Sequence, residues 1–91
     1  MLGVLYSERR VKMDLNKFLE WLQREQGMSV RSARDVVSRL KRVAKITKEE
    51  EISSETIAAL ENSNEYAEAS PFIRSQLKRA VVLYTEFTVQ E

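Results

Sequence analysis

Apolar residues recur every three or four positions along most of this 91-residue chain, which is the spacing of a helix that buries one face. The chain has two Gly and one Pro, too few for the turns that a sheet of this size needs. The sequence therefore predicts an all-α fold, a small orthogonal bundle of four to five helices. The expected helices cover 15–26, 30–46, 54–62 and 71–88, with one further turn over 65–69.

Capping residues mark both ends of the first helix and the start of the second. Asp14 is a suitable N-cap for the first helix, and Gly27 supplies the left-handed residue that ends it. Ser29 can cap the second helix, and a capping box from Ser32 to Asp35 is the alternative if that helix begins one turn later. Because the connection is only a few residues long, we expect the two helices to form an antiparallel or angled hairpin.

The second half of the chain contains a predicted linker and a clear helix start. The acidic run at 48–51 is predicted to be a solvated linker, after which Ser53 or Ser54 caps the short helix. Ser70 followed by Pro71 is the sharp boundary, because a serine N-cap and a proline at the first helical position favour the same helix start.

One domain is expected for a chain of this length. It is predicted to cover 14–88, while 1–13 are expected to be an N-terminal arm or an extension of the first helix. The apolar positions of the expected helices predict a common core. Its predicted members are Phe18, Leu19, Leu22, Val37, Leu40, Val43, Ile57, Leu60, Ile73, Leu77, Ala80 and Tyr84.

Two apolar residues beside these stripes are the candidate interface residues. Trp21 lies at the edge of the first helix's stripe, so it either completes the core or contacts a base or a protein partner. Val82 lies roughly opposite the apolar stripe of the last helix and faces water or a partner. Phe72 and Leu83 lie at the margins of that stripe. The last helix is thus apolar over a wide arc, which indicates a helix that is sandwiched between elements or used at an interface.

Charge is distributed unevenly along the chain, although the net charge is only +1. Residues 1–48 hold twelve Lys/Arg against five Asp/Glu, whereas residues 49–91 hold three against nine. The stretch 29–48 alone has seven Lys/Arg and one Asp inside a helical pattern. One side of that helix is aliphatic, and the other carries Arg31, Arg34, Ser38, Arg42 and Lys45.

A helix that is aliphatic on one side and cationic on the other can pack on its own domain while its cations bind a phosphate backbone. The candidate contacts to duplex DNA are Arg31, Arg34, Arg42 and Lys45, with Arg39, Lys41 and Lys78 as secondary contacts. Two other interpretations stay open: a solvated face, or one that pairs with acidic residues of the second half. The scarcity of aromatic residues among the cations disfavours single-stranded nucleic acid as the ligand.

Residue types argue against catalysis, cofactors and a small-molecule substrate. The chain has no His and no Cys, so the commonest general base, metal ligand and thiol nucleophile are missing. Consecutive carboxylates at 49–51 point in different directions and do not converge on a cation. Gly3 and Gly27 alone cannot form a phosphate-binding loop. The apolar start is too short for a signal peptide or membrane span, so the default expectation is a cytoplasmic protein that is not an enzyme.

Four segments carry a resemblance to a known family. They are Phe-Leu-Glu-Trp-Leu at 18–22, Gly-Met-Ser at 27–29, the basic helix at 31–42 and the last helix at 75–87. Together they resemble the core-binding domain of tyrosine recombinases and phage integrases, an N-terminal SAM-like domain. The resemblance covers about residues 14–88 and rests on helical patterns.

The resemblance implies a bundle of four or five helices that clamps one side of duplex DNA, mostly through the DNA backbone. Two features depart from the family. The catalytic domain is absent, and a chain without His cannot perform the family's chemistry, so Tyr6, Tyr66 and Tyr84 are not expected to be nucleophiles. The middle of the chain, 48–69, is acidic where such a domain often stays basic. The expectation is a non-catalytic DNA-binding module.

The competing hypothesis is a non-enzymatic protein-interaction or assembly module. Its two halves have opposite charge, so they could match head to tail between copies or engage a charged partner. A two-fold dimer would instead pair patches around Val82.

Overall fold

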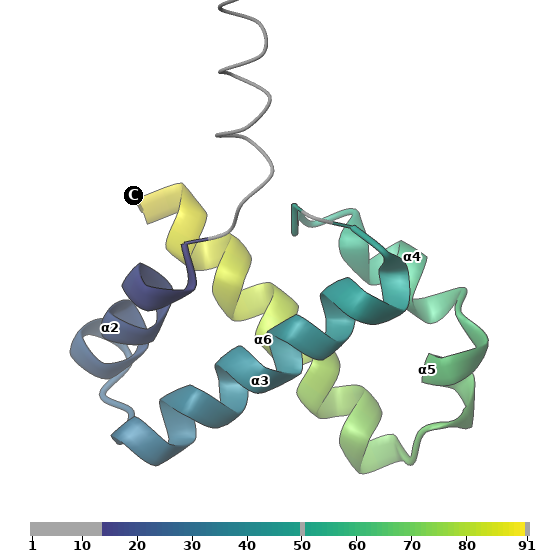
Figure 1. Cartoon of the computed structure of the whole chain (residues 1–91), viewed down its shortest axis with the longest axis horizontal. Coiled ribbons are helices and arrows are strands. Elements are labelled where there is room, and N and C mark those ends of the chain that lie inside the picture. The colour runs from purple at the N-terminus through teal and green to yellow at the C-terminus, as the bar shows by residue number, and fades with distance from the viewer. Residues whose placement is uncertain (1–13, 50, 91) are drawn as a thin grey trace, which may run out of the picture.

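The computed structural model describes residues 14–49 and 51–90, which form five α-helices and no strand (Figure 1). This confirms the all-α prediction. The prediction of an arm or helix extension over 1–13 lies outside the described residues. The helices are α2 (Leu15–Glu25), α3 (Val30–Thr47), α4 (Thr56–Glu61), α5 (Asn64–Glu68) and α6 (Pro71–Gln90).

The predicted caps of α2 and α3 are confirmed. Asp14 Oδ1 accepts a hydrogen bond from the amide three residues along, at 3.0 Å, and Gly27 is left-handed, with φ of 66°. Ser29 Oγ accepts from the Ser32 amide at 3.2 Å. The helix therefore begins at the first of the two starts considered, and the capping box from Ser32 to Asp35 is wrong. At the other sharp boundary, Ser70 Oγ accepts from the amide three residues on at 3.2 Å, as predicted.

The start of α4 differs from the prediction. Its N-cap is Glu55, which makes no side-chain capping bond, so neither serine is the N-cap residue. Ser53 Oγ does accept a hydrogen bond from the Glu55 amide at 3.3 Å, in the turn that precedes the helix, so the prediction of a serine at this start holds in part. The Ser53 amide also donates to Thr56 Oγ1 at 2.9 Å, and the Thr56 hydroxyl donates to Glu49 Oε1 at 2.8 Å. Thr56 is fully buried, and a buried hydroxyl needs such partners.

The acidic run at 48–51 is consequently not a purely solvated linker. Glu49 is half-buried because it accepts the bond from Thr56. Ile52, directly after the run, is 4% exposed and belongs to the core. The prediction failed here because a single isoleucine between charged and polar residues has no helical periodicity to indicate its burial.

Helix α3 is the central element of the core. It packs on α6, α2 and α4, and Figure 1 shows it crossing α6 near the middle of both helices. Most predicted core residues are buried, and Leu19, Val37, Ile57 and Ile73 are half-buried against them. The core also contains residues that the prediction left out, namely Trp21, Ala33, Val36, Ile52, Tyr66, Val81, Leu83 and Phe87.

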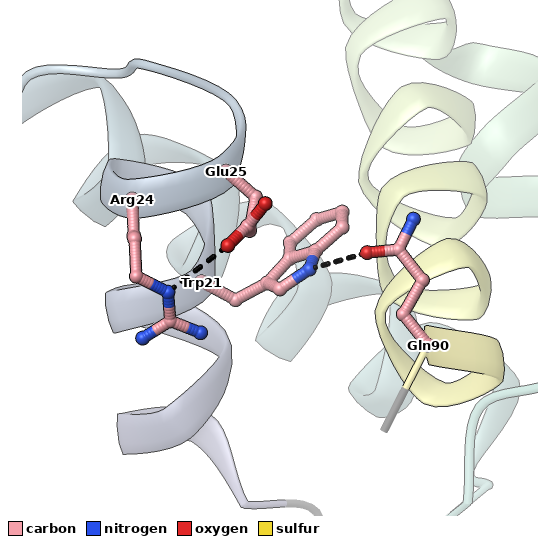
Figure 2. Close-up of polar contacts among 4 residues, drawn as sticks. All are labelled: Trp21, Arg24, Glu25 and Gln90. Atoms are coloured by element: carbon pink, nitrogen blue, oxygen red, sulfur yellow. Dashed lines mark hydrogen bonds and ion pairs between the residues drawn. The ribbon is translucent and has the colours of Figure 1, made fainter.

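Helix α6 buries a wide arc, as its pattern indicated. Its buried residues include Val81 and Leu83 as well as Leu77, Ala80, Tyr84 and Phe87. The C-terminal half of the helix lies beside α2 (Figure 1). There the Trp21 indole donates a hydrogen bond to Gln90 Oε1 at 2.9 Å (Figure 2). The sandwiched position explains why so many faces of one helix are apolar.

The described part is a flat body of 46 × 32 × 18 Å. Its smallest dimension corresponds to two layers of helices, and each helix has exposed residues on one side. None of the helices in this part of the chain combines the length and hydropathy of a membrane span.

Candidate nucleic-acid interface

The packing of α3 decides which of its side chains point outward. Ala33, Leu40 and Val43 are fully buried and Val36 nearly so, which fixes the rotation of the helix against α2, α4 and α6. The opposite side then projects into solvent. It carries five exposed cations, Arg31, Arg34, Lys41, Arg42 and Lys45, which we call the basic face. At 1.5 Å per residue, the face extends about 21 Å along the helix.

The positive charge of the basic face is not neutralised by the described surroundings. Asp35 is the one carboxylate on α3, and it is exposed. Within 14–49 and 51–90, the ion pairs are Arg24–Glu25 at 3.1 Å and Lys78–Glu61 at 2.9 Å, and neither involves α3. Clustered charges of one sign, left without partners, produce a local potential that attracts anions.

A shallow groove runs along each flank of α3. On the α2 side, Arg34 and Lys41 share a groove of about 320 Å³ with Asn16 and Ser38. On the α6 side, the half-buried Arg39 lies in a groove of about 330 Å³ together with Arg79. The basic face is thus a convex ridge between two grooves, each of which holds cationic side chains.

The α6 wall of the second groove was not predicted as part of a site. Phe72, Gln76 and Arg79 line it, and their spacing of four and three residues places them on one side of a helix. That spacing was the available signal. Phe72 is 65% exposed at the rim, which leaves a large apolar side chain beside two cations.

Lys78, predicted as a secondary DNA contact, forms an ion pair with α4 and lies apart from the basic face. Its Nζ donates to Glu61 Oε2 on α4 at 2.9 Å. The hydrogen bond and the charge of Glu61 raise the pKa of Lys78 above its usual 10.5, so the ammonium is occupied by a carboxylate. The sequence could not show this pairing because the two residues are seventeen positions apart.

Of the two candidate interface residues, Trp21 is buried and Val82 is exposed. Trp21 is 1% exposed and packs against Phe18 and Phe87. Its indole has no free surface for a base or a partner, so the structure places it in the core and corrects its assignment as an interface residue. Val82 is 43% exposed on the outer side of α6, where the pattern placed it.

The described residues bear on two kinds of chemical site, a metal centre and a tyrosine nucleophile. They contain no group of three or more Asp and Glu side chains positioned to hold a metal ion. Tyr66 and Tyr84 are 8% and 6% exposed. Burial, with smaller contributions from Asp14 and Glu51, raises the pKa of the Tyr84 phenol above its usual 10.0. Both phenols therefore serve the core, and Tyr6 lies outside the described residues.

No protein family, curated protein or solved structure was found to match the chain. The resemblance to core-binding domains gains no support from these comparisons and stays a hypothesis.

Proposed function

We propose that this chain is a non-enzymatic module that binds duplex DNA through the basic face of α3. The observation that carries the proposal is the set of five exposed cations, none of which has an ion-pair partner among residues 14–49 and 51–90. Releasing counterions from DNA phosphates is the main source of affinity for such a surface. Arg39, in the groove beside the face, adds a sixth cation within reach of the same ligand.

The arrangement favours binding that tolerates many DNA sequences. Phosphate contacts position a protein on DNA but carry no sequence information. The basic face consists of arginine and lysine side chains, which suit phosphate oxygens. A bundle that clamps one side of duplex DNA through the backbone is also what the resemblance to core-binding domains implies.

The test is a fluorescence-anisotropy titration of a labelled duplex with the full chain over a range of salt concentrations. Each neutralised phosphate contributes about −0.9 to the slope of log K against log salt. Removing two contacts with R31Q/R42Q should therefore make the slope less steep by about 1.8. Absence of binding at about 50 mM salt, where phosphate contacts are strong, would refute the proposal.

Two control variants make the result specific to α3. K17Q/R24Q removes the same charge from the exposed side of α2 and should leave the slope within about 0.3 of the original value, because neither residue belongs to the face. R9Q/R10Q tests the cations before Asp14. A slope that responds equally to all three double variants would show that net charge, and not the α3 face, governs binding.

A second candidate function is supported by one specific observation. Residues 51–68 carry five glutamates and no Lys or Arg, and all five are exposed. An acidic surface of this kind repels DNA and suits a basic protein surface instead. It therefore favours a protein-interaction role alongside DNA binding.

A further inference from the structure

The molecule carries two charged surfaces of opposite sign on different elements. The first is the basic face of α3. The second, which we call the acidic edge, lies on and beside α4 and α5, at the end of the molecule opposite α2 (Figure 1). It consists of Glu51, Glu55, Glu61, Glu65 and Glu68, all exposed.

The two surfaces carry similar amounts of opposite charge. The basic face has five cations beside one exposed carboxylate, Asp35. The acidic edge has five carboxylates, one of which is paired with Lys78. The Arg74 guanidinium donates to the Ala67 carbonyl at 3.4 Å, so a second cation lies beside the segment of α5 that carries two of these carboxylates. The basic face therefore carries about four uncompensated charges and the acidic edge about three, and the described residues form no ion pair between them. The two surfaces are complementary in sign and similar in amount of charge.

We infer that the acidic edge of one copy docks on the basic face of a second copy. The contact joins two different surfaces, so it is heterologous, and each copy can use both of its surfaces at once. Association then continues beyond the dimer as concentration rises. Exposed ion pairs each contribute little, so the contact is weak and becomes populated at about 0.1–1 mM protein.

This association regulates the site of the proposed function. A docked acidic edge covers cations that DNA would otherwise contact, so self-association and DNA binding compete. That consequence rests on the proposed function, whereas the docking itself does not. The experiment is therefore done without DNA, so that failure of one proposal leaves the other unaffected.

The first measurement is sedimentation of the full chain at two salt concentrations. At about 0.01 M salt the screening length is about 30 Å, and at about 1 M it is about 3 Å. The average mass should increase with protein concentration at low salt and return to that of the monomer at high salt. A monomer under both conditions, or an oligomer indifferent to salt, would overturn the inference.

The second measurement assigns the contact to the two surfaces. R34Q/K41Q weakens the basic face and keeps the acidic edge, whereas E65Q/E68Q does the reverse. Each variant alone should associate about 2- to 30-fold more weakly than the original chain, the range expected for two exposed pairs. Glutamine is used because charge reversal would create a new complementary pair between the variants.

Mixing the variants restores one intact contact. Labelled R34Q/K41Q should bind unlabelled E65Q/E68Q with the affinity of the original chain, and about 2- to 30-fold more tightly than it binds itself. The matched control, K17Q/R24Q, should associate like the original chain. Equal affinities in the mixed and unmixed experiments would overturn the inference, because they would show that the charges of these two surfaces do not form the contact.

Discussion

The two ends of this molecule are held together by different interactions. Where α2 meets the C-terminal half of α6, four aromatic rings pack with centroids 5.0–6.1 Å apart; they are Phe18, Trp21, Tyr84 and Phe87. At the other end, α4 and α5 have six and five residues. There the buried Thr56 is held by hydrogen bonds to Ser53 and Glu49.

The difference indicates how each end loses its structure. Helices this short are not stable without tertiary contacts, and α4–α5 has one fully buried leucine, Leu60, beside Thr56. Such an end can open locally while the rest stays folded. The aromatic end involves both α2 and α6, so its loss should coincide with global unfolding.

The largest effect is expected from Phe18→Ala. Phe18 contacts the other three rings of the cluster and is fully buried. Its truncation should lower the free energy of unfolding by about 3–5 kcal/mol, enough to unfold much of a small domain. Urea denaturation measures this loss. The exposed Val89→Ala is the control and should change stability by less than about 0.5 kcal/mol; a similarly small effect of Phe18→Ala would contradict the role of the cluster.

Thr56→Val should weaken the other end by about 1–3 kcal/mol, since it leaves the Ser53 amide and Glu49 without their partner. Valine keeps the shape of the threonine side chain, so this loss of stability comes from the missing hydrogen bonds and not from altered packing. Hydrogen exchange should accelerate in α4 and α5 before it does in α2. Ser54→Ala, at the neighbouring exposed position, serves as the control. Uniform acceleration over all helices would show that the two ends open together.

Gln90→Ala removes the bond from the Trp21 indole, the polar contact between α2 and the end of α6 (Figure 2). The expected loss is about 0.5–1.5 kcal/mol, the usual net contribution of one hydrogen bond. Since Trp21 is the one tryptophan of the chain, its fluorescence reports the change directly. An unchanged emission spectrum and an unchanged midpoint would mean that the bond does not hold the two helices together.

The smallest expected effect on stability is a decrease in alkaline solution. The pKa of Tyr84 is raised mainly by burial, and that of Lys78 by the hydrogen bond to Glu61. Both groups therefore hold their protons more tightly when folded. Their contribution to stability is complete below the pKa values of the unfolded chain, near 10, and is lost as the pH rises through the higher folded values. Urea midpoints between about pH 8 and 11 should fall, and less so in Tyr84→Phe; a rise would contradict the sign.

Periodicity was sufficient to predict the long helices α2, α3 and α6, because each of them buries apolar residues that recur at helical spacing. It also predicted the cationic side of α3, since the buried Leu40 and Val43 fix the rotation of that helix. Capping was predictable where a single residue satisfied the orphan amides, as Ser29 and Ser70 do. Those features depend on residues close in sequence.

Features that depend on distant residues could not be predicted. The Lys78–Glu61 pair and the Trp21–Gln90 bond join positions 17 and 69 residues apart, and nothing in the local pattern identifies such partners. From the local sequence Thr56 would be predicted to be exposed, because its hydrogen-bond partner Glu49 lies seven residues earlier. The groove residues of α6 required the crossing with α3 to become neighbours of Arg39.

The 18 Å thickness of the body has a mechanical consequence. Helix α3 presents cations on one side and core residues on the other, so no intermediate layer separates a bound ligand from the packing with α6. A rotation of α3 that improves contact with a ligand must slide Leu40 and Val43 over their neighbours in the same movement. Because closely packed interiors deform in discrete steps, the part of the domain built from α2, α3 and α6 should act as a rigid plate that accepts or rejects a surface as a whole.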